Sequence, residues 1–249
     1  MSVSRSEWNE LASLPGVASV IDPADSFGLK NQLIDHVHWQ SLRKALCGGS
    51  KVLDFGCGIG RFAARIQQQG QCYLGIDSAW NMLASARRRN SAATSFVCFD
   101  GLRIPLRDGS CELILCCTVL QYIMSSPDRD ATLAEFHRVL APRGRIVMCE
   151  HASVAGRTGS DPANCSTIQD YMDSLSAANL KVIATTKIRR YDLSGITRRV
   201  LRLGRYARGV AVPLLPLLAK FERRRASSSD EQTLRNIPYF ELVIEAEAC

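Results

Sequence analysis

The stretch Val52-Leu-Asp-Phe-Gly-Cys-Gly-Ile-Gly-Arg61 decides the fold of this chain. A short apolar run, typical of a buried strand, leads into three glycines at alternate positions. Glycine lets the backbone turn sharply and lets a ligand approach where a Cβ would otherwise stand. The turn opens a predicted helix, whose free N–H groups and dipole favour a bound anion or carboxylate. A G-x-G-x-x-G dinucleotide fingerprint that starts at Gly56 needs a glycine at position 61, which is Arg61, so the spacing argues against a nicotinamide dinucleotide.

Strand-like and helix-like segments alternate on both sides of this turn. The hydrophobic pattern predicts strands over 51–55, 72–76, 95–99, 113–117, 145–149, 181–188 and 239–248. It predicts helices over 61–69, 79–89, 129–140 and 166–178, and another before the turn, where Leu33, Val37, Leu42 and Leu46 recur at helical spacing. Strands separated by helix-length segments predict an α/β fold with a mostly parallel sheet and helices around it.

The length of the chain suits one large α/β domain with an elaboration. We divide its 249 residues into an N-terminal helical segment (1–50), an α/β core (51–190), a basic helical insertion or cover (191–236) and a last core strand (237–249). The first residues lack the apolar stretch and cleavage site of a signal peptide. No apolar run reaches the roughly 18–20 residues that span a bilayer.

Ten cysteines stand in the sequence without a C-x-x-C pair. Cys98, Cys116, Cys117 and Cys149 fall in apolar, strand-like runs, where free thiols act as small hydrophobic residues. The pattern therefore predicts unpaired cysteines in a reducing cytoplasm and no metal site.

The acidic residue and the three glycines form a D-x-G-x-G-x-G motif that resembles the first motif of class I S-adenosylmethionine-dependent methyltransferases. The resemblance implies S-adenosyl-L-methionine as the cofactor and a Rossmann-like, seven-stranded sheet with an antiparallel last strand. It also implies that the motif holds the methionine part of the cofactor. The residues of this turn expected to bind the cofactor are Asp54, Gly56, Cys57, Gly58 and Gly60.

The ends of the second and third strands supply further expected contacts with the cofactor. Asp77 closes the second strand 21 residues beyond Gly56, where a carboxylate accepts hydrogen bonds from a ribose diol. Ser78 and Met82 follow beside the expected adenosine. In the family an acidic residue after the third strand often contacts the adenine amino group, and the matching positions here are Asp100, Gly101 and Leu102.

The fourth and fifth strands resemble the family segments nearest the transferable methyl. Cys117 ends the fourth strand and is a candidate neighbour of the cofactor; position 121, often histidine in the family, is Gln121. His151 ends the fifth strand and is the leading candidate base, because an unperturbed imidazole titrates at about pH 6.5. Its structural alternative is a hydrogen-bonded histidine in the crevice wall. Tyr122 and Glu150 are the weaker candidates.

The acceptor is constrained less closely than the cofactor. The first hypothesis is a small-molecule, lipid-linked or glycan-type acceptor, and no Asn-Pro-Pro-Tyr-like signature follows the fourth strand to indicate amino methylation of a base. The second is a nucleic-acid methyltransferase that uses the basic C-terminal stretch, although only three aromatic residues lie between 191 and 225. The third is a non-catalytic cofactor-binding protein, which the intact acidic and glycine positions disfavour.

Most of the positive charge of the chain lies between residues 191 and 235. Ten basic residues face four acidic ones there, a net charge of +6 out of +7 for the whole chain. Arg198, Arg202 and Arg205 share a helical face, and Val200, Leu201 and Leu203 supply apolar surface beside them. We expect a cover that contacts an anionic acceptor or the anionic inner face of a membrane; a solvated helical pair packed on the sheet edge is the alternative.

Overall fold

A computed structural model describes residues 4–48, 51–91, 94–123, 126–154, 166–237 and 239–248. The strands form one seven-stranded sheet in the order β3-β2-β1-β4-β5-β7-β6. Their bounds are β1 (Lys51–Phe55), β2 (Cys72–Asp77), β3 (Ser95–Cys98), β4 (Cys111–Cys117), β5 (Leu140–Ala152), β6 (Leu180–Arg190) and β7 (Phe240–Ala248). The predicted fold class is confirmed, because β7 runs antiparallel to β5 and β6 while β1 to β5 pair in parallel.

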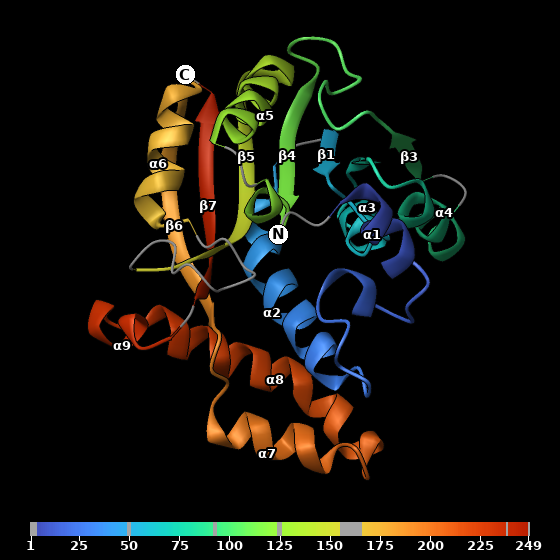
Figure 1. Ribbon diagram of the computed structural model, residues 1–249, viewed down its shortest axis with the longest axis vertical. Helices are drawn as coiled ribbons and strands as arrows, with labels where there is room; N and C mark the ends of the chain where they lie inside the picture. The colour runs from blue at the N-terminus through green and yellow to red at the C-terminus, as the bar shows by residue number, and fades with distance from the viewer. Residues whose placement is uncertain are drawn as a thin grey trace.

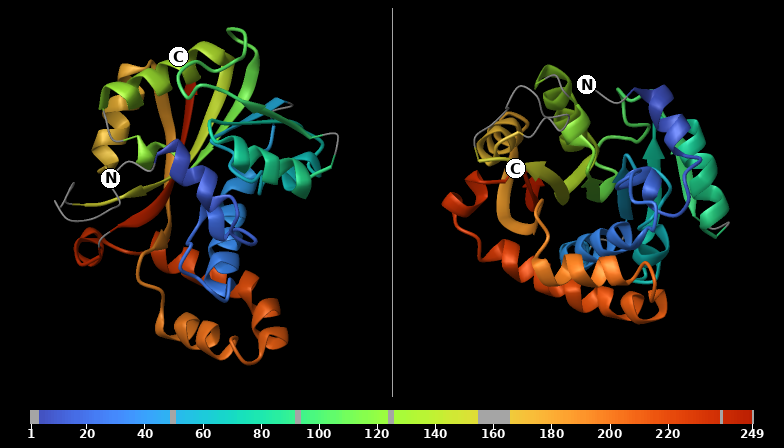
Figure 2. Two further views of the ribbon diagram at one scale, coloured as in Figure 1. Left: turned by 45° about the vertical axis from the view of Figure 1, so that its right-hand side comes forward. Right: turned by 60° about the horizontal axis from the view of Figure 1, so that its bottom comes forward.

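Helices surround this sheet and extend beyond one end of it (Figures 1 and 2). They are α1 (Arg5–Leu11), α2 (Leu29–Ala45), α3 (Ala63–Gln67), α4 (Trp80–Arg89), α5 (Ser126–Val139), α6 (Ile168–Ala177), α7 (Gly195–Leu203), α8 (Arg208–Ser227) and α9 (Glu231–Arg235). Two short 3-10 turns, η1 (Ala18–Val20) and η2 (Leu120–Tyr122), flank the carboxyl ends of the strands.

Alternation along the strands divides the core between the two faces of the sheet. Leu113, Leu115 and Cys117 of β4 pack on the face that carries α2, α3 and α8. Ile114 and Cys116 pack on the opposite face, which carries α5 and α6. Both sets are buried, as expected for a strand in the middle of a sheet covered by helices on both sides.

Several elements differ by a few residues from the sequence-based expectation, and the start of the fifth strand differs most. The fifth strand begins at Leu140, not at 145, because Leu140 already pairs with Cys111 before the register of β4 and β5 shifts. Pro213 and Pro216 interrupt an apolar run of the sequence, yet both lie inside one continuous helix, α8. Helix α8 packs along α2 and β6, and Gln40 Nε2 of α2 donates to the carbonyl of Pro216 at 2.9 Å. Tertiary packing therefore offsets the hydrogen bonds that the two prolines remove.

Candidate functional site

A cavity of about 230 Å³ lies at the carboxyl ends of β1, β2 and β4. This is the edge where open α/β sheets bind their ligands. Ten of the residues predicted from the sequence line it: Asp54, Gly56, Cys57, Gly58, Asp77, Ser78, Met82, Gly101, Cys117 and Tyr122. Gly60, Asp100, Leu102 and His151 were predicted with them but do not line it.

The glycine turn after β1 leaves no room for side chains. Gly56, Gly58 and Gly60 all have φ between 53° and 66°, the left-handed region that glycine adopts without strain. A Cβ on Gly56 would lie 2.5 Å from Val119 Cγ2, and one on Gly60 would lie 2.7 Å from the Phe96 ring. Gly56 thus shapes the cavity wall, whereas the space beside Gly60 is filled by packing against β3.

Two carboxylates stand at the ends of β1 and β2 and line the cavity. Asp77 Oδ2 accepts the backbone N–H of Gly58, and its Oδ1 accepts that of Ala79, both at 2.8 Å. Each oxygen keeps a second lone pair for a ribose hydroxyl. Asp54 Oδ2 accepts the hydroxyl of Tyr73 at 2.6 Å, and burial raises the pKa of this carboxyl to about 7.

The loop after β3 contributes backbone and an aromatic ring, not the predicted carboxylate. Phe99 and Gly101 line the cavity. The Asp100 side chain is exposed and accepts the N–H groups of Leu102 and Arg103 at 2.8 and 3.0 Å, so it closes its own turn. Asp100 and Leu102 therefore do not line the cavity, and the contact predicted between them and the adenine stays a prediction.

The N-terminal helix covers the cavity, which the sequence did not indicate. Arg5 and Trp8 of α1 and Val20 of η1 line it. The Trp8 ring meets that of Tyr122 edge-on at 5.1 Å, and Asn9 accepts the backbone N–H of Asn81 at 2.8 Å, which ties α1 to α4. The only local signal was Ser4-x-x-Glu7, which forms a capping box and starts α1.

Glu241 of β7 organises a buried polar cluster behind the cavity. Its carboxylate contacts Arg189 at 2.5 and 2.8 Å, His38 Nε2 at 2.9 Å and His151 Nε2 at 3.2 Å. Burial opposes ionisation, but the charge of Arg189 and the hydrogen bonds from His38 and His151 outweigh it and hold the pKa of Glu241 well below its usual range. The predicted base is thus oriented by a carboxylate that lies 90 residues away along the chain.

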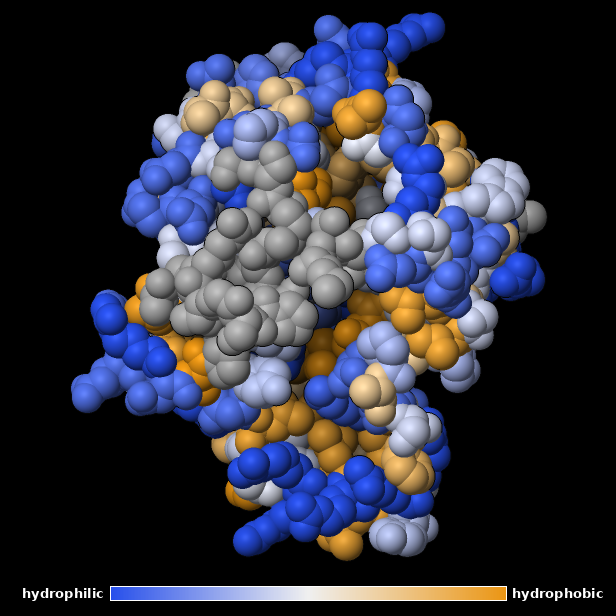
Figure 3. Space-filling model, in the orientation of Figure 1, coloured by the Kyte–Doolittle hydropathy of each residue, from blue (hydrophilic) through white to orange (hydrophobic). Residues whose placement is uncertain are grey.

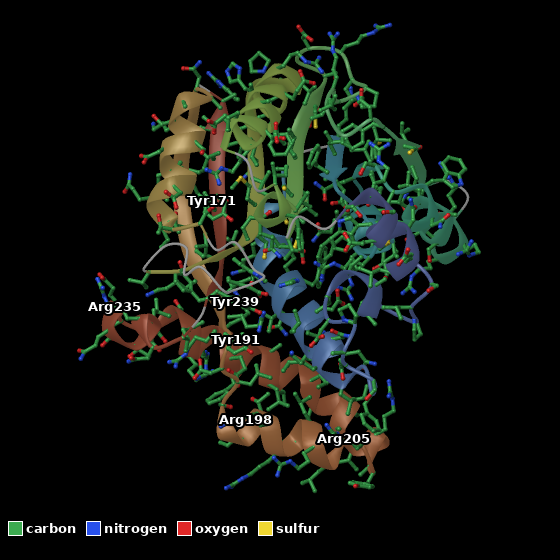
Figure 4. All side chains as sticks on the ribbon, viewed as in Figure 1. Tyr171, Tyr191, Arg198, Arg205, Arg235 and Tyr239 are labelled. Atoms are coloured by element: carbon green, nitrogen blue, oxygen red, sulfur yellow. The ribbon has the colours of Figure 1, made fainter. Side chains whose placement is uncertain are left out.

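His151 presents one unpartnered nitrogen. Its Nε2 faces Glu241, and its Nδ1 is buried without a hydrogen-bond partner within the described ranges. Burial lowers the pKa of His151, so the ring is neutral near pH 7. Because a carboxylate only accepts, Nε2 carries the proton and Nδ1 the free lone pair. The His151 ring stacks on that of Tyr239, with the ring centroids 4.2 Å apart. Tyr239 in turn contacts Tyr191 edge-on, and Figure 4 labels both tyrosines.

His38 connects this cluster to the cavity through Arg61. Burial opposes a second proton on His38, but Glu241 and Cys117 favour one, and together they raise the pKa of His38 to about 9. The 3.0 Å contact between Arg61 Nη1 and His38 Nδ1 argues against a second proton on His38, because a guanidinium only donates hydrogen bonds and needs a lone pair on Nδ1. We assign the protonation state of His38 from this contact, since a proton on Nδ1 would place two hydrogen-bond donors opposite each other. His38 is therefore neutral and donates through Nε2 to Glu241.

The described residues contain no group of three His, Cys, Asp or Glu side chains that could hold a metal ion. Across the same ranges, no helix is long and apolar enough to cross a membrane.

Known proteins resemble the chain over this part of the fold. Residues 53–148 match the family described as "Methyltransferase domain". An uncharacterized 37.1 kDa protein of a Streptomyces fradiae transposon is 35% identical over 74% of this chain and 49% of its own length. A malonyl-[acyl-carrier protein] O-methyltransferase of Marinomonas sp. is 34% identical over 39% of this chain and 36% of its own length. The chain therefore spans half or less of the length of these relatives.

The fold also matches solved structures. Geranyl diphosphate C-methyltransferase from Streptomyces coelicolor, solved with S-adenosyl-L-homocysteine, superposes with a TM-score of 0.58 over 92% of this chain and 86% of its own length, at 14% identity. The cavity suits S-adenosyl-L-methionine, because Gly56 and Gly58 carry no side chains and Asp77 keeps free lone pairs. The chain contains a class I S-adenosylmethionine-dependent methyltransferase domain, whose cofactor is S-adenosyl-L-methionine.

Proposed function

We propose that the protein transfers a methyl group from S-adenosylmethionine to a small-molecule, lipid-linked or glycan-type acceptor. The observation that carries the proposal is one cavity that joins the glycine turn and Asp77 to the aromatic pair Trp8 and Tyr122. The carboxylate and turn suit the cofactor, and the aromatic pair suits an organic acceptor. Two of the names fit this class, an O-methyltransferase of an acyl-carrier protein and a C-methyltransferase of geranyl diphosphate, whereas a tRNA methyltransferase of Macaca fascicularis, 33% identical over 45% of this chain, fits the nucleic-acid alternative.

The bound cofactor would supply an activated methyl group on a sulfonium, so the protein has to position the acceptor and exclude water. Trp8 of α1 and Tyr122 of η2 would enclose the acceptor side of the cavity. Burial raises the pKa of Tyr122, so its hydroxyl stays protonated at neutral pH and orients the acceptor as a hydrogen-bond donor. This role differs from the base that the sequence suggested for Tyr122.

For an acceptor that must lose a proton, we propose His151 as the base. Support comes from its neutral ring, its free Nδ1 lone pair and the Glu241 carboxylate that fixes the tautomer. His151 also lies next to η2, because Gln121 Oε1 accepts its backbone N–H at 3.2 Å. The acceptor would therefore reach from the cavity past Gln121 toward the end of β5.

Incubation of the protein with methyl-labelled cofactor and separate pools of lipids, glycans, small metabolites and nucleic acids tests the proposal. We expect label in one of the first three pools and none with Asp77→Ala. Label only in nucleic acid would overturn the acceptor class in favour of the nucleic-acid alternative. Cofactor binding without transfer to any pool would favour the non-catalytic alternative.

We further propose that the α7–α8 surface contacts an anionic membrane. Its exposed apolar side chains are Ile196, Leu203, Tyr206, Val210, Leu214, Leu217 and Phe221, with exposed fractions between 38% and 91%. Its exposed basic side chains are Arg198, Arg199, Arg202, Arg205, Arg208, Lys220 and Arg224. None of these seven forms a salt bridge with another described residue.

Apolar side chains and cations without a salt bridge lie together on these two helices and in the turn that joins them. Figure 3 shows apolar side chains over α8 beside the hydrophilic band of α7, and Figure 4 places Arg198 on α7 and Arg205 in the turn that follows it. A bilayer surface accepts both kinds of side chain, whereas nucleic acid needs only the cations. Each basic residue near an anionic surface contributes about 1 kcal/mol, so these helices would attach reversibly.

Sedimentation with vesicles tests this contact. We expect binding to phosphatidylglycerol–phosphatidylcholine vesicles at low salt, none to phosphatidylcholine alone, and loss of binding in Arg198→Glu/Arg199→Glu/Arg202→Glu. The matched control Arg88→Glu/Arg103→Glu/Arg107→Glu makes the same change in charge at exposed positions elsewhere and should keep binding. Binding to nucleic acid with a steep salt dependence, and none to vesicles, would contradict the membrane contact.

We place the protein in the cytoplasm. None of the eight cysteines among the described residues forms a disulfide, which suits a reducing compartment.

A further inference from the structure

Cys117 differs from the other buried cysteines because its sulfur faces a buried guanidinium. It is the last residue of β4, is 8% exposed and lines the cofactor cavity. Arg61 Nη2 donates to Cys117 Sγ at 3.2 Å. The Arg61 side chain is only 6% exposed, so water does not replace this acceptor.

The other contacts of Arg61 leave its charge poorly compensated. Its Nη1 contacts Asp35 at 3.4 Å, which is long for a charge-assisted hydrogen bond. Arg65 makes the closer contact with that carboxylate. His38, the second partner of Nη1, is neutral in the arrangement described above. A buried guanidinium is stabilised by a nearby anion, and the group that faces Nη2 is the sulfur of Cys117.

Neighbouring thiols are equally buried, so the contact with Arg61, and not burial, distinguishes Cys117. Burial favours the neutral thiol, yet a hydrogen bond from Cys149, the charge of Arg61 and the neighbouring His38 ring hold the pKa of Cys117 well below its usual range. Burial raises the pKa of Cys57, which also lines the cavity, well above that range. Burial and Glu150 do the same for Cys116, on the opposite face of β4.

We propose that Cys117 is a thiolate in the resting protein and a covalent modification site for small electrophiles that enter the cofactor cavity. With an alkyl iodide, a bond forms between Cys117 Sγ and carbon, the carbon–iodine bond breaks and iodide leaves. No proton is released, because the sulfur is already deprotonated. Modification adds bulk inside the cavity, so the electrophile and the cofactor exclude each other. This exclusion rests on the proposed function, whereas the thiolate itself does not.

The pH dependence of alkylation tests the thiolate. The protein is treated with iodoacetamide at pH 6.5 and pH 8.5, with glutathione as a reference thiol, and each cysteine is followed by peptide mass spectrometry. An ordinary thiol of pKa about 8.5 loses about fiftyfold in rate between these two values. We expect less than a threefold loss at Cys117 and no labelling of Cys57 at pH 6.5. A fiftyfold loss at Cys117, or no labelling of it at either pH, would overturn the proposal.

Two variants locate the cause. Arg61→Gln keeps a donor but removes the charge, and we expect the rate at Cys117 to regain the steep pH dependence of an ordinary thiol. Arg61→Lys keeps the charge and should retain most of the flat profile. Equal profiles in both variants would exclude Arg61 as the counter-ion and overturn the assignment.

Protection by S-adenosylhomocysteine separates this inference from the proposed function. We expect the product to slow alkylation of Cys117 at least tenfold. If calorimetry detects no binding of S-adenosylhomocysteine while the flat profile persists, the proposed function fails and the thiolate stands. If S-adenosylhomocysteine binds without protecting Cys117, modification through the cofactor cavity is excluded.

Discussion

Asp77 holds the glycine turn in place: its Oδ2, at the end of β2, accepts the backbone N–H of Gly58 at 2.8 Å. The carboxylate expected to bind the ribose therefore also fastens the turn expected to hold the methionine part of the cofactor. The two strands that carry these residues are neighbours in the sheet, with Phe55 opposite Ile76. We therefore expect cofactor binding and the geometry of the turn to be coupled through this hydrogen bond.

We expect Gly56→Ala to destabilise the fold through two separate effects. The left-handed backbone costs about 1–2 kcal/mol for a residue with a Cβ. The new methyl also meets Val119 at 2.5 Å, and such overpacking costs about 1–3 kcal/mol more. Urea unfolding measures the sum.

Gly16→Ala is the matched control for Gly56→Ala, because Gly16 has the same left-handed backbone but no atom lies within 4 Å of where its new methyl would stand. Gly16→Ala should lower the free energy of unfolding only by the cost of the left-handed backbone. Adding Val119→Ala to Gly56→Ala should restore the part of the stability that is lost through overpacking. If the double variant is no more stable than Gly56→Ala alone, contact with Val119 is not the cause.

Glu241 should make stability depend on acid pH. Its pKa is depressed in the folded state, so its contribution is complete above the unfolded value of about 4.5 and disappears as pH falls through the folded value. Glu241→Gln leaves Arg189 without its partner and should cost about 3–5 kcal/mol at pH 7. Urea unfolding should show this difference shrinking between pH 4.5 and pH 3.

The exposed Glu231→Gln serves as the control for Glu241→Gln, and we expect it to leave stability unchanged at every pH. A difference between Glu241→Gln and the natural protein that stays constant from pH 7 to pH 3 would contradict the ionised, paired state of Glu241.

Helix α1 should act as a cover whose order depends on the ligand. It contributes Arg5 and Trp8 to the cavity wall, but its described residues include no buried side chain. We expect S-adenosylhomocysteine to protect α1 from limited proteolysis, and Trp8→Ala to weaken this protection while leaving the midpoint of thermal unfolding within about 2 °C. Equal cleavage with and without the ligand would exclude α1 from the site.

His151→Ala should reduce turnover far more than cofactor affinity. Removal of a general base costs typically about 10²–10⁴ in rate, whereas His151 does not line the cofactor cavity. Tyr122→Phe removes only a hydroxyl from the cavity wall and should raise the KM for the acceptor more than it lowers kcat. Full turnover by His151→Ala would leave His151 as a structural partner of Glu241.

The parts of the site that follow from local sequence could be predicted, and those that depend on distant pairing could not. The glycine spacing and Asp77 are local to one βαβ unit, so their place at the cavity was foreseeable. His38 and Glu241 lie 203 residues apart and meet only because α2 packs against the sheet beside β7. Nothing in either segment alone indicates that contact, nor the guanidinium that faces Cys117.

Turn chemistry and tertiary packing account for the remaining differences. Asp100 carries both the family position and an Asp-Gly turn signal, and its side chain bonds to its own loop. Prolines inside a helix ordinarily break or kink it, but the packing of α8 on α2 and β6 keeps the helix continuous through Pro213 and Pro216. Trp8 lies outside the family motifs, so its place over the cavity had no counterpart in the sequence pattern.

Calorimetric titration of S-adenosylhomocysteine into the natural protein, Asp77→Ala and Asp100→Ala tests the central claim most directly. Asp77 lines the cavity and Asp100 closes its own turn. Two lost hydrogen bonds to a carboxylate, each about 1.5–3 kcal/mol, predict at least a hundredfold weaker binding for Asp77→Ala. Asp100→Ala should stay within threefold of the natural protein. Unchanged affinity in a folded Asp77→Ala protein would contradict the assignment of this cavity to S-adenosylmethionine.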